Sequence, residues 1–254
     1  MRQINFSFGV FLLAAASVLA SCNKDPFTKC SLVKSVDSTS NTTYAYNADG
    51  NVSKIVTTDQ SVTPNTVSSS EYTYNADKKL VKIAETVNGA ASGVSDITYD
   101  AAGLPSKLTK FNSVGALEAT HFLRYSNKLL AVDSTIEVGN PDLTKATYSY
   151  DANKNLTKIV LAVSVVVVNV EFSNYDTQRN PSKLQRGVPF GTDGFLLPNS
   201  GPNNPLKTTI GSPFGSTTIV NTIAKYTDEG FPVTISSKSG TDPADIITYT
   251  YSCD

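Results

Sequence analysis

Residues 43–56 read TYAYNADGNVSKIV, and this pattern returns along the chain with small changes. Tyrosine and threonine alternate with small residues, a polar run ending in Gly50 follows, and a second alternating stretch comes after it. Alternation of aromatic or β-branched residues with polar ones is typical of β-strands. Asn and Asp side chains bond their own backbone in turns, and glycine accepts a positive φ. The stretch therefore predicts a β-hairpin.

Six further copies predict a meander of such hairpins. The copies are EYTYNADKKLVKIA (71–84), DITYDAAGLPSKLT (96–109), FLRYSNKLLAV (122–132), TYSYDANKNLTKIV (147–160), EFSNYDTQRNPSKL (171–184) and AKYTDEGFPVTI (224–235). The tyrosine before each turn recurs at Tyr46, Tyr74, Tyr99, Tyr125, Tyr150, Tyr175 and Tyr226. A repeat of fixed period means that each copy pairs with its neighbours, so the strands are expected to be antiparallel with local contacts.

The two ends of the chain match the two halves of one more copy. Residues 249–254, YTYSCD, align with residues 44–49, and residues 30–36, CSLVKSV, align with residues 50–56. The chain would thus begin and end inside the turn of an eighth hairpin. If the last strand pairs with the first, no strand edge stays exposed, which removes a site of aggregation.

Cys30 and Cys253 fall in this split turn, two positions apart in the alignment. In an exported protein an isolated pair of cysteines indicates a disulfide. Seven copies and the split one give about sixteen strands, an even number that suits a closed up-and-down barrel. We therefore predict an all-β barrel, or a flattened barrel, whose terminal strands pair and are joined by a Cys30–Cys253 disulfide.

Residues 187–215, GVPFGTDGFLLPNSGPNNPLKTTIGSPFG, interrupt the repeat and are rich in glycine and proline. Long irregular loops on a rigid scaffold often carry function. One interpretation is a binding lid whose apolar candidates are Phe190, Phe195, Leu196, Leu197 and Phe214. The favoured interpretation is a plug that covers a mouth of the barrel or fills its interior. The most apolar run, residues 159–172, is expected to form two strands buried on both faces.

The N-terminus has the features of an export signal. Arg2 precedes a short apolar run that ends in Leu19-Ala20-Ser21-Cys22. This run is too short for a membrane-spanning helix and suits a cleaved signal peptide. Small residues directly before a cysteine resemble the lipobox of bacterial lipoproteins, in which that cysteine becomes the lipidated first residue. The expected organisation is a signal peptide (1–21), a tether (22–29) that starts at lipidated Cys22, and one barrel domain (30–254).

The turns YNADGN, YDAAG, YDANKN and YDTQRN resemble the YD-repeat, Rhs-related family of bacterial envelope and toxin-shell proteins. With the lipobox and the chain length, the sequence is similar to lipid-anchored bacterial proteins of unknown function that are described as porin-like in fold. This resemblance implies a lipoprotein of the outer membrane, on its periplasmic or cell-surface face. The family carries no assigned activity, so the resemblance implies no catalytic residue.

Charge and side-chain chemistry narrow the function further. The chain has 21 basic and 22 acidic residues, which gives no concentrated basic surface for nucleic acid. His121 is the only histidine, so a His-based triad or a multi-histidine metal site is not expected. The repeated Asp100, Asp151 and Asp176 are assigned to turns. The sequence predicts no catalytic residue, no metal and no cofactor.

A lysine recurs eight residues after most of the tyrosines, at Lys54, Lys82, Lys107, Lys158 and Lys183. One interpretation is a basic ladder for an anionic glycan or lipid head group. The favoured interpretation is cross-strand packing, with Lys54 opposite Tyr44, Lys82 opposite Tyr72 and Lys158 opposite Tyr148. Charges in the middle of strands are costly against lipid, which argues against a membrane-spanning barrel unless they line a pore.

We therefore expect a non-enzymatic, lipid-anchored, monomeric barrel of the envelope that binds a glycan or another envelope protein, or serves as a scaffold. The first alternative is a component of an outer-membrane transport system or pore. The second alternative is a glycan-cleaving enzyme whose pair of carboxylates forms only in three dimensions.

Overall fold

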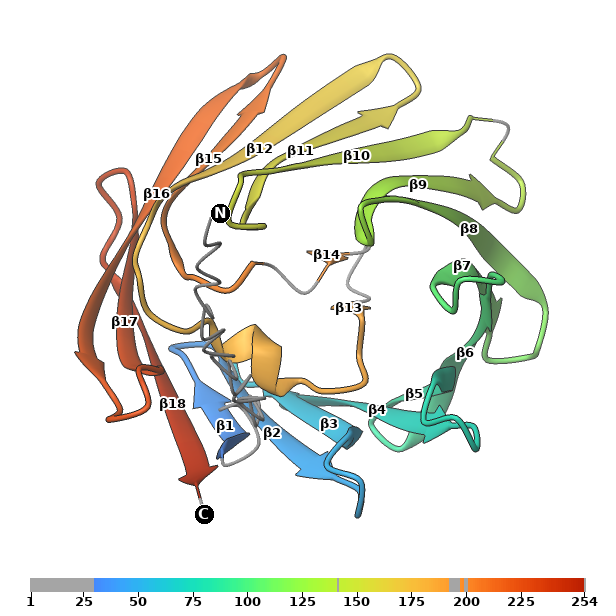
Figure 1. Cartoon of the computed structure of the whole chain (residues 1–254), viewed down its shortest axis with the longest axis horizontal. Coiled ribbons are helices and arrows are strands. Elements are labelled where there is room, and N and C mark those ends of the chain that lie inside the picture. The colour runs from blue at the N-terminus through green and yellow to red at the C-terminus, as the bar shows by residue number, and fades with distance from the viewer. Residues whose placement is uncertain (1–29, 141, 192–196, 199–200, 254) are drawn as a thin grey trace, which may run out of the picture.

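The computed structural model describes residues 30–140, 142–191, 197–198 and 201–253. Its barrel strands are β1 (Cys30–Val36), β2 (Ser40–Tyr46), β3 (Val52–Asp59), β4 (Thr66–Tyr74), β5 (Leu80–Val87), β6 (Ala90–Tyr99), β7 (Pro105–Asn112), β8 (Leu117–Ser126), β9 (Leu129–Glu137), β10 (Thr144–Tyr150), β11 (Leu156–Val163), β12 (Val166–Tyr175), β15 (Pro205–Ser212), β16 (Gly215–Tyr226), β17 (Pro232–Ser239) and β18 (Asp245–Cys253). These sixteen antiparallel strands form one closed barrel in chain order, with β12 beside β15 and β18 beside β1 (Figure 1). The predicted all-β barrel with paired terminal strands is confirmed.

The signal peptide (1–21) and the tether with Cys22 (22–29) lie outside the described residues. Between β12 and β15, the chain forms a short 3-10 helix, η2 (Pro181–Leu184), and a separate two-stranded ribbon of β13 (Phe190–Gly191) and β14 (Leu197–Pro198). In Figure 1 these elements lie within the outline of the barrel. Among the described residues, no helix is long and apolar enough to cross a membrane.

Each hairpin formed by a copy of the sequence repeat contains the same one-residue bulge directly after its turn. In the first hairpin Tyr46 pairs with Val52 but Ala45 pairs with Lys54, so Ser53 is the extra residue. The same shift occurs in hairpins β4–β5, β6–β7, β8–β9, β10–β11 and β16–β17. Because side chains alternate between the two faces of a sheet, one extra residue exchanges the faces of everything beyond it.

This bulge makes the predicted lysine–tyrosine pairs wrong. The lysines at 54, 82 and 158 pair with Ala45, Thr73 and Ser149. The tyrosines at 44, 72 and 148 pair instead with Ile55, Ile83 and Ile159. The tyrosines therefore share the inner face with apolar residues, and the lysines lie on the outer face.

A ladder of tyrosine hydroxyls lies at one end of the barrel. Six tyrosines near the ends of their strands each donate a hydrogen bond to a carbonyl oxygen near the start of the preceding hairpin's second strand. The donor–acceptor pairs are Tyr46–Leu32, Tyr74–Val52, Tyr99–Leu80, Tyr150–Leu130, Tyr175–Leu156 and Tyr251–Pro232. Burial of the phenols raises the pKa of Tyr46 and Tyr150 to about 12. We call the end of the barrel that carries this ladder the tyrosine end.

The split hairpin at the chain termini has the same construction. The predicted Cys30–Cys253 disulfide is present, and the two cysteines pair in register between β1 and β18. Tyr251 pairs with Leu32 and Thr250 with Lys34, which is the same one-residue bulge. The ends of the chain thus form an eighth copy of the repeat, in which a disulfide takes the place of the turn.

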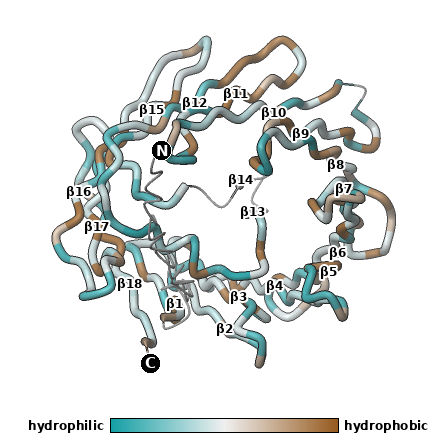
Figure 2. Tube along the Cα trace, in the orientation of Figure 1, coloured by the Kyte–Doolittle hydropathy of each residue, from teal (hydrophilic) through white to brown (hydrophobic). Residues whose placement is uncertain are grey.

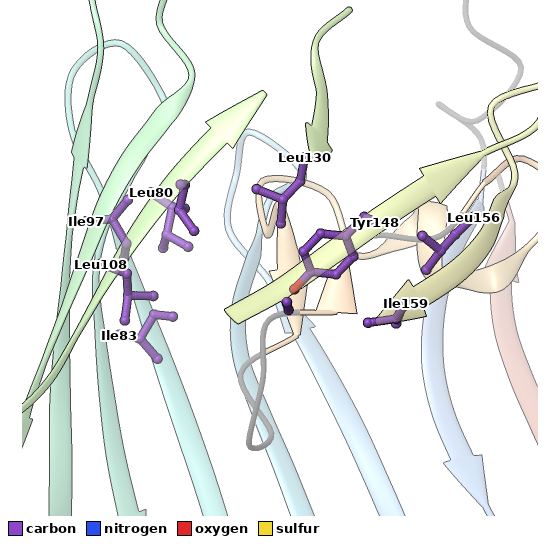
Figure 3. Close-up of a cluster of buried hydrophobic side chains, with 10 residues drawn as sticks. Leu80, Ile83, Ile97, Leu108, Leu130, Tyr148, Leu156 and Ile159 are labelled. Atoms are coloured by element: carbon purple, nitrogen blue, oxygen red, sulfur yellow. The ribbon is translucent and has the colours of Figure 1, made fainter. Parts of the chain in front are cut away.

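The barrel interior holds the apolar core near the tyrosine end. A buried cluster joins β5 to β11, and its members come from the inner face of each strand (Figure 3). Two groups are visible there, Leu80, Ile83, Ile97 and Leu108, and then Leu130, Tyr148, Leu156 and Ile159. A second cluster of Cys30, Leu32, Leu184 and Phe231 lies where the chain termini meet η2.

The irregular region occupies residues 176–204 rather than the predicted 187–215. Residues 205–212 form barrel strand β15, and residues 213 and 214 form the turn to β16. The proline and glycine content suggested a loop, but Thr208 and Ile210 alternate with outer-face residues as in the other strands. The irregular region starts before the predicted residue 187, because the 3-10 helix η2 occupies Pro181–Leu184, where the sequence predicted the second strand of a hairpin.

Candidate functional site

The outer wall of the barrel carries exposed ion pairs. Lys54 Nζ lies 2.8 Å from Glu71 Oε1, and Lys158 Nζ lies 2.9 Å from Glu171 Oε1, each across neighbouring strands. All four side chains are well exposed to solvent. These two lysines of the series therefore point away from the interior and pair with acidic residues of the next strand.

The described residues between β12 and β15 (176–191, 197–198 and 201–204) pack inside the barrel at the tyrosine end, and we call them the plug. The backbone N–H of Val52, the first residue of β3, donates a hydrogen bond to the carbonyl oxygen of Arg186 over 3.0 Å. Arg186 Nη2 donates to the Cys30 carbonyl over 2.8 Å. The fully buried Leu184 packs with Leu32 and Phe231. These contacts fix the first half of the plug to β1, β3 and the β16–β17 turn.

Asparagine side chains fix the second half of the plug. Asn155 Oδ1, in the β10–β11 turn, accepts from the backbone N–H of Asn203 over 3.2 Å. Asn204 Nδ2 donates to Asp176 Oδ2 over 2.9 Å. Asn155 and Asn204 are buried, and so is Gly201, whose place a larger residue cannot take because a Cβ would overlap the backbone of Asn155. This network was not predicted from the sequence, although the consecutive Asn203 and Asn204 indicate side chains able to bond a neighbouring turn.

A hollow of about 500 Å³ runs along the inner wall of β2–β6 and ends against the plug. We call it the inner hollow. Hydroxyl, phenol and carboxylate groups dominate its lining, with Gln185 and Val188 contributed by the plug. Its other lining residues are Thr42, Tyr44, Ile55, Thr57, Ser68, Ser69, Ser70, Tyr72, Glu85, Thr86, Val87 and Ser92. One hydroxyl pair is hydrogen-bonded across strands in this lining, Thr42 with Thr57.

His121 lies inside β8 with Asp133 and Thr135, both of the neighbouring β9. His121 Nδ1 is 3.0 Å from Asp133 Oδ2 and 2.9 Å from Thr135 Oγ1, and all three side chains are buried. No acidic partner of His121 was predicted from the sequence. The register His121–Thr135 explains the contact, because residues 121, 133 and 135 all face inward.

This cluster does not have the arrangement of a catalytic triad. In a triad the nucleophile and the carboxylate lie at opposite nitrogens of the imidazole. Here Thr135 Oγ1 and Asp133 both contact Nδ1 of His121. A carboxylate only accepts hydrogen bonds, so His121 Nδ1–H donates to Asp133, and Thr135 O–H donates to Asp133 as well. The contacts hold a buried carboxylate by hydrogen bonds, as burial requires.

His121 also lines a second hollow of about 320 Å³, together with Lys110, Glu118, Thr135 and Glu137. This hollow lies toward the end of the barrel opposite the tyrosine end, since Val138 of the β9–β10 connection lines it as well. Both signs of charge are present in it. The cluster is thus a polar contribution to the interior of a barrel whose tyrosine end is apolar.

Lys183 is the member of the lysine series that does not lie on a strand. It belongs to η2 and lines a shallow groove at the tyrosine end with Lys78, Lys79, Tyr99 and Arg186. Burial lowers the pKa of Lys183. Lys78 pairs with Asp49 over 2.7 Å, and Lys79 lies over the ring of Tyr99. The groove is therefore less basic than its lysines suggest.

The structure does not bring the predicted loop residues together. Phe195, Leu196 and Cys22 lie outside the described residues, and only the backbones of Phe190 and Leu197 are described, in β13 and β14. Phe214 lies in the β15–β16 turn at the opposite end from the plug, and it is 88 % exposed. Within the described residues, one group of potential metal ligands is close enough to hold an ion, Cys30, Glu229 and Cys253, but its two sulfurs form the disulfide.

No protein-family model matches the chain, and no curated protein matches it either. A solved structure of a porin-like protein from Bacteroides uniformis has a TM-score of 0.61 over 89 % of this chain and 96 % of its own, at 15 % sequence identity. A second porin-like protein, from Bacteroides vulgatus, has a TM-score of 0.43 over 87 % and 98 % of the two chains, at 11 % identity. A chain of the Photorhabdus luminescens Tc holotoxin pore matches over 82 % of this chain and 9 % of its own, with a TM-score of 0.29 and 15 % identity. The first of these structures confirms the predicted porin-like fold.

Proposed function

We propose that this protein is a non-enzymatic, monomeric binding protein of the bacterial envelope that takes a hydroxyl-rich ligand, such as part of a glycan, into the inner hollow. The observation that carries the proposal is the lining of that hollow. The Ser, Thr and Tyr hydroxyls can donate and accept hydrogen bonds, and the Glu85 carboxylate can accept them. Tyr44 and Tyr72 offer aromatic faces. Sugars present hydroxyls and apolar ring faces together, which suits this combination.

The ion pairs of the outer wall support a barrel that sits in water. A lipid on Cys22 would hold this barrel at the membrane, as the resemblance of the sequence to YD-repeat-like lipoproteins implies. The Lys54–Glu71 and Lys158–Glu171 pairs lie on the outer wall of their strands. In a lipid-facing wall such charges would be costly. The plug argues in the same direction, because its described residues are hydrogen-bonded to the barrel at the tyrosine end, where they would obstruct a pore.

A binding experiment with two matched variants tests the inner hollow. We expect oligosaccharides of envelope glycans to raise the melting temperature of the mature domain, because a ligand that binds the folded state stabilises it. Glu85→Gln replaces a carboxylate of the hollow, and Glu71→Gln makes the same change on the outer wall. Affinity should fall about tenfold or more in the first variant, since hydrogen bonds to charged groups contribute about 1.5–3 kcal/mol, and stay unchanged in the second.

Equal binding by both variants would remove the inner hollow from the proposal. Ligand turnover would contradict the non-enzymatic part, and new reducing ends measured after long incubation detect it. Glu118 and Glu137, which line the second hollow, would then be the first residues to replace by glutamine.

A further inference from the structure

The most exposed apolar side chains of the described chain lie at the tips of hairpins at one end of the barrel. Val165 is 92 % exposed, Phe214 is 88 % exposed and Val114 is 83 % exposed. They lie in the turns β11–β12, β15–β16 and β7–β8, all at the end opposite the tyrosine end. Val138 and Leu143, in the β9–β10 connection, are also more than half exposed. We call these five residues the apolar tips.

The fold does not require apolar residues at these positions. Turns favour Gly, Asn, Asp, Ser and Pro for conformational reasons, and the β5–β6 turn at the same end is Asn88-Gly89. In Figure 2 the end of the β11–β12 hairpin is brown, which marks an apolar run that continues to the very tip. Residues 159–172 were expected to be buried on both faces, yet their hairpin projects Val165 into solvent.

Charge divides this end of the barrel into two halves. The three most exposed tips have uncharged neighbours, in Ser113-Val114-Gly115, Ser164-Val165 and Pro213-Phe214-Gly215. The turns of the other half carry aspartates at its hairpin ends, at Asp37, Asp59 and Asp242. These three tips can leave water without a neighbouring charge. Asp142, beside Leu143, and the aspartates of the other half favour water.

We propose that the apolar tips insert into the interfacial region of a lipid bilayer whose surface is electrically neutral. The five side chains come from four separate hairpin connections rather than one continuous patch, and separate prongs suit a fluid phase that can close around each of them. The aspartates of the other half are costly to remove from water and stay in it, so the barrel tilts toward the half with the exposed apolar tips. The proposal is independent of the ligand of the inner hollow.

The tether has the length to let both contacts act together. Eight residues separate Cys22 from Cys30, and eight extended residues reach up to about 26–29 Å. A strand of eight residues tilted as in a barrel spans about 20 Å along the axis. A lipid on Cys22 and the apolar tips can therefore engage one bilayer, although Cys30 lies at the tyrosine end. Stable attachment through a lipid generally needs such a second contact.

Vesicle flotation with residues 23–254, which include every barrel strand but no lipidation site, tests the proposal. We expect this chain to float with phosphatidylcholine vesicles. The variant Val114→Ser/Val165→Ser/Phe214→Ser should lose about tenfold or more of that binding. Binding of the unchanged chain should differ little between about 0.1 and about 0.5 M salt, because salt screens charge interactions and not apolar ones. The matched control is Phe122→Ser/Val220→Ser/Ile246→Ser, which removes three partly exposed apolar side chains of the strands instead of the turns.

Fluorescence gives a second, local readout. The chain contains no tryptophan, so Phe214→Trp and Phe122→Trp each introduce a single reporter. Vesicles should shift the emission of the first variant to shorter wavelength and leave the second unchanged. Equal flotation of the two triple variants would overturn the proposal, and so would binding that requires anionic lipid. Concentration-dependent dimers that the tip substitutions abolish, without flotation, would also overturn it and assign the tips to a second copy of the chain.

Discussion

At the scale of single residues, the tyrosine before each turn combines two contacts. Its ring packs against the apolar cluster, and its hydroxyl donates to a carbonyl of the preceding hairpin, as Tyr99 does to Leu80 over 2.8 Å. The carbonyl that accepts this bond lies at the bulge, where the regular ladder is interrupted. The hydroxyl therefore satisfies a backbone group that the strand pairing leaves open.

Replacing these tyrosines by phenylalanine tests the ladder. Tyr99→Phe and Tyr150→Phe each remove one hydroxyl and keep the ring, so each should lower the free energy of unfolding by about 0.5–1.5 kcal/mol. The two residues belong to separate repeats, and their effects should add. Urea denaturation of the single and double variants measures both points. A double variant as stable as the wild type would show that the ladder hydrogen bonds do not contribute to the free energy of unfolding.

His121 and Asp133 show the limit of sequence reasoning at this scale. Twelve positions separate them in the sequence, and neither lies in a recognised motif. Only the register of β8 and β9 brings them together, and that register depends on the tight turn at residues 127–128 and the bulge after it. A single-residue count from the turn would have found the pair, whereas the composition of the two strands does not reveal it.

At the scale of elements, the hairpin repeat was predictable because turn residues and strand alternation agree in nearly every copy. Sequence reasoning placed the strands, their order and the closure of the barrel. The bulge was not predicted, because the second strand begins with the same kind of apolar residue whether or not one extra residue follows it. Sequence reasoning also misplaced the edges of the irregular region, since Pro205 and Gly211 look like loop residues but occupy β15. The plug's asparagine contacts depend on turns far away in sequence and could not be predicted.

The split hairpin leads to a prediction about redox chemistry. Reduction of the Cys30–Cys253 disulfide should lower the free energy of unfolding by about 2–4 kcal/mol, because the bond closes a loop of nearly the whole barrel domain. Thermal or urea unfolding with and without reductant measures the change. The double variant Cys30→Ser/Cys253→Ser should not respond to reductant. If reduction leaves the wild type unchanged, pairing of β1 with β18 is sufficient to close the barrel.

The plug leads to a prediction about packing. Leu184 is fully buried against Leu32 and Phe231, so Leu184→Ala should destabilise the protein by about 2–5 kcal/mol. Leu143→Ala is the matched control, since that leucine is half exposed and its loss should change stability by about 0.5 kcal/mol or less. Chemical denaturation compares the two. Similar effects would mean that η2 rests on the barrel without contributing to its core.

At the scale of the whole molecule, the barrel has three distinct surfaces. The tyrosine end is closed by the disulfide, the apolar clusters and the plug. The outer wall carries exposed ion pairs, and the opposite end presents the apolar tips. A barrel built in this way has one end fixed by packing, so membrane contact is expected at the other end, whereas the inner hollow lies along the inner wall and ends against the plug.

Because the members of the tyrosine ladder all lie at one end of the barrel, their ionisation should act on the molecule as a unit. An unfolded tyrosine has a pKa of about 10, and burial raises the pKa of two ladder members, Tyr46 and Tyr150, to about 12. A raised folded-state pKa means that the folded protein holds more protons than the unfolded one above pH 10. The stabilisation is therefore complete below about pH 10 and is lost as pH rises toward about 12. Phenolate absorbance and circular dichroism recorded together over this window should change in one cooperative step. If the phenolates form before the β-sheet signal is lost, the ladder hydroxyls ionise inside the folded barrel and do not hold it closed.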